Sequence, residues 1–225
     1  MILRQTGAMF VDAYRELNYK KMFWITLALS MVVVAAIACI GINDQGFTVF
    51  KWTFPIELLN TSIIEKSAFY RFVFYTFGFG IWLTWAATIL AIISTASIIP
   101  DFVSSGSIEL SLSKPIGRLR LFFTKYLTGL TFVALQVAVF ALGAFIVIGI
   151  RGGSWDLRMF WSIPLVLLFF SYLYCISALV GILTRSTVAA ILVTVLLWAV
   201  IWMAHMVESG WLLQTRVQYD VAVQL

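Results

Sequence analysis

The residues of this chain that are arranged to contact another molecule gather between two apolar runs, in the segment from Pro100 to Lys125. This segment holds a turn-former at Gly106, a short acidic and apolar piece, a helix stop at Pro115 and four cations. A loop that only joined two helices would need about five residues. Because this one is much longer and internally organised, we interpret it as a contact surface for a cytoplasmic partner. The short piece contains Ile108, Glu109, Leu110 and Leu112, and the cations are Lys114, Arg118, Arg120 and Lys125.

Residues with catalytic spacing are absent from the sequence. There is no GxxxxGK[ST] phosphate loop, no HExxH, no GxSxG and no cluster of cysteine and histidine. The one histidine, His205, lies near the outer end of the last apolar run, where it is either a substrate or proton contact or a histidine satisfied at the membrane interface. We therefore predict no catalysis, no metal site and no cofactor in this chain.

The composition indicates a membrane protein. The chain is 62% hydrophobic and 11% charged, outside the range of soluble domains, and its 225 residues leave no room for a separate soluble domain. We predict an all-α integral membrane protein with a single transmembrane domain. Each of five apolar runs is long enough for a bilayer core of about 30 Å. These spans are residues 22–42, 72–99, 126–150, 159–183 and 187–207.

The segments outside the spans have distinct characters. Residues 3–21 form an amphipathic pattern with cations at its end, which indicates a helix lying in the interface. Residues 43–71 are mixed and aromatic, so we expect an external loop that rests on the membrane surface, with a short strand where Phe50, Trp52 and Phe54 alternate with polar residues. Residues 208–225 are polar enough to lie outside.

The charge distribution predicts the orientation of the spans. The segments assigned to the cytoplasm hold nine cations and four acids, whereas the external segments hold six of each. The whole net charge of +5 is therefore cytoplasmic, in agreement with the positive-inside rule. This places the N-terminus in the cytoplasm. We expect the membrane to be the plasma (inner) membrane.

The span interiors also limit the mode of transport. They contain no Asp, Glu, Lys or Arg, and a proton- or ion-coupled carrier normally needs such groups at mid-depth. A channel or secondary carrier is therefore disfavoured. The energy for any transport must come from another chain.

The cytoplasmic loop resembles that of the type-2 ATP-binding-cassette permeases, the membrane subunits of exporters whose ATPase is a separate chain. The similarity includes an acidic residue at Asp101, Gly-Ser-Ile-Glu at residues 106–109, Lys-Pro-Ile at residues 114–116, Arg118, and the Lys-Tyr pair at residues 125–126. Two residues depart from the family pattern, with Asp101 in place of Glu and Gly117 in place of Ser. The family has six spans, whereas five are predicted here, which leaves a sixth span unaccounted for.

The resemblance implies that the loop is a coupling element that docks into a groove on the ATPase. Its physical features agree, because Gly106 permits a sharp turn, Pro115 stops a short helix, and Ile108 shares a helix face with Leu112. The alternative is that the four cations anchor the loop to anionic lipid. The candidate ATPase-coupling residues are Asp101, Gly106, Ile108, Glu109, Leu110, Leu112, Pro115 and Arg118.

By this resemblance the chain is the permease subunit of an ATP-driven exporter. It would work with a second permease copy, identical or related, and with ABC ATPase subunits that carry the ATP and Mg²⁺. The lipid membrane is its other expected partner, and no nucleic acid is. The alternative is a non-transporting membrane anchor or assembly factor that uses the same loop to recruit a cytoplasmic partner.

Two tryptophan pairs are candidates for a substrate path. Trp82 and Trp85 are predicted to share one face of the second span, and Trp198 and Trp202 one face of the fifth. In the resembling family these spans flank the dimer interface. The alternative is that the rings face lipid or pack between helices.

The orientation can be tested by cysteine labelling. In a background without Cys39 and Cys175, single cysteines at Ser113 and Ser154 should react with an impermeant thiol reagent from opposite sides of the membrane. Labelling of both positions from the outside would contradict the five-span arrangement.

Overall fold

The computed structural model describes residues 21–44, 46–50, 52–54, 61, 64–100 and 118–223 of the chain. In this part, five helices are long and apolar enough to cross a membrane, which confirms a mostly helical multi-span membrane protein. Most of the predicted interfacial helix at residues 3–21 lies outside the described residues. The five helices are Lys21–Cys39, Lys66–Pro100, Leu119–Gly152, Leu157–Thr184 and Thr187–Trp211.

A small antiparallel sheet follows the first helix. Helix α2 (Lys21–Cys39) ends at Cys39 rather than at the predicted Ile42, because the next residues form a strand. Strand β1 (Ile40–Asn43) pairs with β2 (Gly46–Val49), which pairs with β3 (Trp52–Phe54). The fold is therefore mostly helical rather than purely α-helical.

The sheet is fixed to the second span by one side chain. The hydroxyl of Tyr70 donates a hydrogen bond to the backbone carbonyl of Ile40 at 2.9 Å. A Cβ atom added at Gly41 would lie 2.9 Å from the same hydroxyl oxygen, so a glycine is needed here for the ring to approach. Phe50, which the alternation placed in the strand, has a φ of 57° and lies in the turn before β3.

The second span is helical, with a change of geometry in its middle and a turn at Ala96 and Ser97 before its last residues. It contains α3 (Lys66–Val73), the π-helix η1 (Phe74–Ala87) and α4 (Thr88–Thr95), and its last helical residue is Pro100. It begins earlier than the predicted Phe72 and is longer than the roughly 20 residues that a bilayer core requires. Its outer part therefore reaches the sheet.

Threonine side chains follow the spacing of the π-helix. The Thr84 hydroxyl donates to the Phe79 carbonyl at 2.9 Å, and the Thr88 hydroxyl donates to the Leu83 carbonyl at 2.8 Å. Both bonds span five residues, as the backbone bonds of a π-helix do. The hydroxyls are thus satisfied inside their own helix, as lipid surroundings require.

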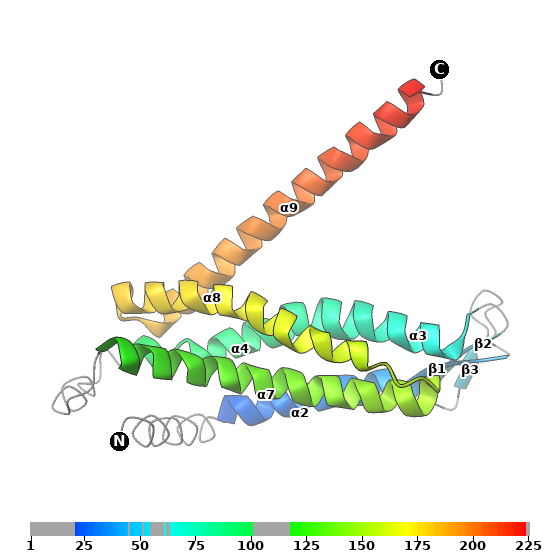
Figure 1. Ribbon diagram of the computed structural model, residues 1–225, viewed down its shortest axis with the longest axis horizontal. Coiled ribbons are helices and arrows are strands. Elements are labelled where there is room, and N and C mark those ends of the chain that lie inside the picture. The colour runs from blue at the N-terminus through cyan, green and yellow to red at the C-terminus, as the bar shows by residue number, and fades with distance from the viewer. Residues whose placement is uncertain are drawn as a thin grey trace.

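The remaining three helices complete the bundle. They are α7 (Arg118–Gly152), α8 (Ser162–Thr184), which follows the short 3₁₀-helix η2 (Leu157–Trp161), and α9 (Thr187–Val223). Helix α7 packs against α2, α3 and α8 and holds much of the buried core, including Phe140. Helix α9 packs against α8 along its first part and then leaves the bundle (Figure 1). It continues past the predicted end of the fifth span at Val207.

The contact between α7 and α8 is closest at Gly129. A Cβ atom added there would lie 2.8–2.9 Å from the hydroxyl and ring carbons of Tyr174, whose side chain is fully buried. Tyr174 packs between the rings of Tyr126 and Phe170, so it has little room to move away. The absence of a side chain at residue 129 therefore sets the spacing of the two helices.

Substitution tests this spacing. Gly129→Ala should lower the free energy of unfolding by about 1–3 kcal/mol through overpacking, measured as a lower melting temperature in detergent. Gly210→Ala is the matched control, because nothing lies within 4 Å of a Cβ atom there and alanine favours the helix. Equal melting temperatures for the two variants would contradict the close approach.

Candidate functional site

The turns between spans place the predicted coupling loop at one end of the bundle. Helix α2 starts, the second span ends, α7 starts and α8 turns into α9 at this same end, which we name the inner end (Figure 1). Of the candidate coupling residues, the seven from Asp101 to Pro115 lie outside the described residues. Arg118 is the first residue of α7, and its side chain is also outside the described part.

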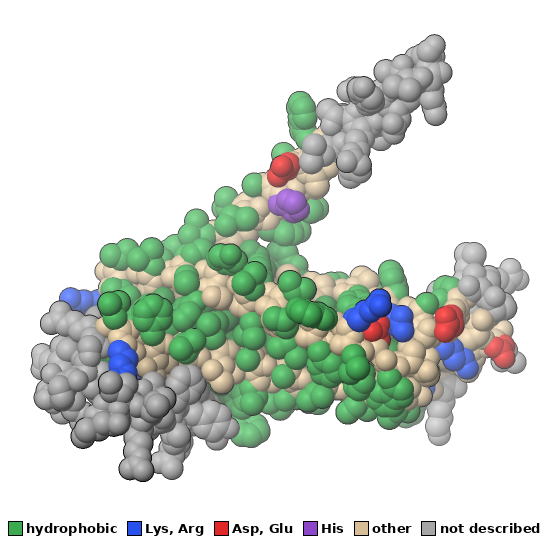
Figure 2. All heavy atoms as spheres, in the orientation of Figure 1, with side chains coloured by type: hydrophobic (Ala, Val, Ile, Leu, Met, Phe, Trp, Pro, Cys, Tyr) green, Lys and Arg blue, Asp and Glu red, His purple; other side chains and the backbone are tan. Residues whose placement is uncertain are grey.

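The two ends of the bundle differ in charge. The described charged side chains at the inner end are the cations Lys21, Arg120, Lys125 and Arg185. The described acids lie at the outer end or on α9 (Figure 2), at Asp44, Glu65, Asp156 and Glu208. Between these ends the spans carry no Asp, Glu, Lys or Arg. The outer end also holds the described cations Lys66, Arg71, Arg151 and Arg158. The described parts of the two ends therefore differ in their acids and not in their number of Lys and Arg residues.

The residue before the loop is fixed to α8. Pro100 is fully buried, and a Cβ atom added at Gly181 would lie 2.8 Å from its Cγ atom. The same atom would lie 3.7 Å from the Cβ atom of Ala190 in α9. Arg185 ends α8 in a left-handed conformation, with a φ of 53°, and its N–H donates to the Gly181 carbonyl at 3.0 Å. Gly181 is therefore the point where the second, fourth and fifth spans meet.

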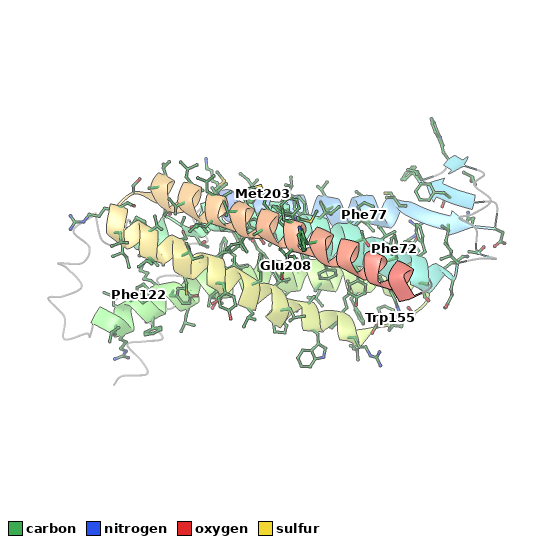
Figure 3. The ribbon with its side chains drawn as sticks, turned by 90° about the horizontal axis from the view of Figure 1, so that it is seen from above. Phe72, Phe77, Phe122, Trp155, Met203 and Glu208 are labelled. Carbon is green, nitrogen blue, oxygen red and sulfur yellow. The ribbon has the colours of Figure 1, made fainter. Side chains whose placement is uncertain are left out.

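The helix after the loop is fixed to α8 as well. The Tyr126 hydroxyl lies 2.8 Å from the Ser171 hydroxyl, 3.0 Å from the Ser171 carbonyl and 3.2 Å from the Cys175 sulfur. Its ring stacks on Tyr174 with centroids 5.0 Å apart, and Phe122, labelled in Figure 3, also stacks on Tyr126, with centroids 6.2 Å apart. Both ends of the predicted coupling loop thus lead directly into contacts with α8.

Three of the four candidate path tryptophans form one cluster. Trp85 stacks on Trp198 with centroids 4.6 Å apart and meets Trp202 edge to face at 5.1 Å. Phe169 of α8 packs on the opposite side of Trp198 at 5.7 Å. Trp198 is 6% exposed, whereas Trp202 is 44% exposed, so the cluster extends from the interior to the surface of the monomer. It joins the second, fourth and fifth spans near the point where α9 leaves the bundle.

Trp82 lies apart from this cluster. Its indole N–H donates to the Ser30 hydroxyl of α2 at 3.3 Å, so it faces the first span. An α-helix would turn by about 100° per residue and place Trp82 and Trp85 on one face, as the sequence predicted. The π-helix has more residues per turn, and its wider spacing directs the two rings to different neighbours.

His205 lies on the exposed part of α9. Its Nδ1 atom is 3.9 Å from a carboxylate oxygen of Glu208, and both side chains are more than 70% exposed. No group of three potential metal ligands is found among the described residues. His205 therefore stands at the surface of the monomer and does not line an enclosed site.

Sequence inspection missed a polar link at the outer end. The Arg71 Nε atom lies 3.6 Å from a carboxylate oxygen of Asp156, and the Arg71 Nη2 atom donates to the Ser154 hydroxyl at 3.2 Å. This joins the second span to the turn between α7 and α8. The turn sequence around Gly153 carries the acid but gives no indication of its partner.

These features define a class of protein: a bundle of apolar helices with charge-free span interiors, a basic inner end and an aromatic contact between the second and fifth spans. Residues 12–216 match the family described as ABC-2 family transporter protein. The chain therefore belongs to the ABC-2 transporter family, and it is the membrane component rather than the ATPase. Neither the curated proteins nor the solved structures contain a match to it.

Substitutions in the tryptophan cluster can distinguish a role in helix packing from a role in lining a substrate path. Trp198→Ala should destabilise the protein by about 3–5 kcal/mol, because it removes a large buried ring. Trp202→Ala should cost only about 1 kcal/mol, mainly the edge-to-face contact. If Trp202 lines a substrate path, this variant should still change substrate-stimulated ATPase activity more than Trp198→Phe does. The measurements are thermal unfolding in detergent and ATPase activity of the reconstituted complex. Parallel losses of expression and activity in alanine variants of all four tryptophans would favour packing alone.

Proposed function

We propose that this chain is the permease subunit of an ATP-driven exporter and that the segment from residue 100 to 118 couples it to a separate ATPase. The observation that supports this most directly is that α8 contacts both sides of that segment, through Pro100 on Gly181 and through Tyr126 on Ser171. A force on the loop would reach α8 from two directions. From α8 it would reach α9, which packs against α8.

This arrangement suits a two-state mechanism. ATP binding would draw two ATPase subunits together and pull the coupling segments with them. Packed helices shift between discrete arrangements rather than deforming continuously, so a displacement at Pro100 would move α8 and α9 as units. The Trp85 contacts with Trp198 and Trp202 are the part of the second and fifth spans that such a shift would break or re-form.

The translocation path would form between two permease copies. The cavity at the centre of the bundle, lined in part by Ser30, Thr88 and Gln136, has a volume of about 10 Å³, enough for one water molecule. A substrate does not fit there in this conformation. Helix α9 meanwhile exposes a long apolar surface beyond the bundle (Figure 2). We propose that this surface, which includes Trp202, Met203, Met206 and Val207, meets the second copy.

Substitutions in the coupling segment test the proposal. A short docking helix offers little area, so a few side chains should dominate its binding energy. Ile108→Ala and Leu112→Ala should each cost about 1–2 kcal/mol of ATPase association. Glu109→Arg should cost more if the ATPase presents a cation to it, because like charges would then face each other. The measurement is recovery of an ABC ATPase with the tagged, full-length chain from its native membranes.

The matched control is Arg120→Ala, because Arg118 is itself a candidate coupling residue. If the segment only anchors to anionic lipid, Arg120→Ala should be the sensitive variant and Glu109→Arg should be silent. Full retention of the ATPase by Glu109→Arg and Leu112→Ala would end the coupling proposal. If the ATPase binds but its activity never responds to the permease, the chain acts as a membrane anchor instead.

A further inference from the structure

A deep apolar groove opens between α2 and the outer part of the second span. It has a volume of about 820 Å³, and every residue that lines it is apolar. Two of them, Phe72 and Phe77, are labelled in Figure 3. One wall is Val33, Ala36 and Ile37, the other is Ala68, Phe69, Phe72, Val73 and Phe77, and the outer end is closed by Ile40, Phe47 and Ile64.

The length of the groove corresponds to one leaflet. Its α2 wall runs from Val33 to Ile37, about 6 Å at 1.5 Å per residue, and Ile40 of the sheet continues it outward. Its second wall, from Ala68 to Phe77, is about 14 Å long by the same measure. Half of a bilayer core is roughly 15 Å. A helix that crossed the membrane would extend far beyond the inner end of this groove, whereas an acyl chain of one leaflet would not.

The two ends of the groove differ in polarity. The outer end borders the sheet and the first turn of α3, where Glu65 and Lys66 are exposed. The inner end lies between Val33 and Phe77, at a depth where the spans carry no charge. The groove is thus polar at the membrane surface and apolar below it. This matches the headgroup and the acyl chains of a lipid in the outer leaflet.

We propose that this groove binds one outer-leaflet phospholipid, with its acyl chains between α2 and the second span and its phosphate next to Lys66. The lysine is complementary in charge to the phosphate. The two helix walls and the sheet surround the chains on several sides, which gives more contacts than the convex surface of a helix does. This site requires neither ATPase coupling nor a substrate.

Photo-crosslinking of the full-length chain in vesicles tests the site. The probes are two phosphatidylethanolamines with a diazirine either at the end of one acyl chain or next to the glycerol. The chain-end probe should label Val33 and Phe77, and the glycerol-side probe should label Phe47 and Ile64. Labelling should be at least fivefold higher than at Leu165 and Leu168, which are exposed on α8.

Two variants fill the groove from opposite walls. Ala36→Trp and Ala68→Trp should each reduce groove labelling at least fivefold and leave labelling at Leu165 unchanged. Val32→Trp is the control, because Val32 is exposed on the same helix but does not line the groove. Thermal unfolding shows whether each variant is folded. If neither variant folds, the test rests on the unmodified chain, in which the chain-end and glycerol-side probes should label residues at different depths.

Three results would overturn the proposal. Equal labelling of the groove and of Leu165 would show that the groove holds only ordinary boundary lipid. If the two probes labelled the same residues, the lipid would have no fixed orientation in the groove. A protein–protein crosslink from a photoreactive side chain at Ala36 to another copy would show that a second permease occupies the groove. Because no ATPase is present, these outcomes are independent of the coupling proposal.

Discussion

The close approach of α8 to its neighbours is the constraint on which the rest of the bundle depends. Lipid tails are as apolar as leucine, so helices in a membrane gain little from hydrophobicity and associate through tight packing. Around α8 the packing is close where a glycine receives a ring, with Tyr174 over Gly129 and Pro100 over Gly181. These two contacts hold the third and second spans to the fourth. They also lie on either side of the predicted coupling loop.

The polar groups of the spans follow from the same surroundings. Without water, each hydroxyl must find a partner within the protein, and most use a carbonyl of their own helix, as Thr95 and Thr194 do. The exceptions lie on α8, where the Tyr174 and Ser177 hydroxyls are buried and have no hydrogen-bond partner within the described part of the chain. An unpaired buried hydroxyl costs free energy. The packed face of α8 therefore combines hydrogen bonds of Ser171 and Cys175 with Tyr126 and contacts at Tyr174 and Ser177 that depend on shape alone.

Sequence reasoning predicted the spans well, because a run of twenty apolar residues admits few alternatives to a helix in lipid. It misplaced the end of α2, because the apolar residues Ile40, Gly41 and Ile42 are compatible with a helix or a strand and only pairing with β2 decides between them.

Sequence reasoning also placed Trp82 and Trp85 on one face, because periodicity assumes an α-helix and the π-helix depends on tertiary packing. Residue type singled out Trp85 and Trp198 as candidate path residues, but it did not predict that their rings stack on each other. Nor could the link from Arg71 to Asp156, because neither residue's sequence surroundings indicate the other. The coupling residues from Asp101 to Pro115 lie outside the described chain and stay a prediction.

The π-helix lets the second span contact two different neighbouring helices. Through Trp82 it is bound to Ser30 of α2, and through Trp85 it is bound to Trp198 of α9. An ordinary α-helix would direct both rings to one side and leave one of these neighbours without an aromatic contact. Because the two contacts lie within one turn of the same helix, a rotation of that turn cannot loosen one without disturbing the other. The second span therefore links the first span to the helix that leaves the bundle, and a movement that begins at Pro100 has a direct route to both.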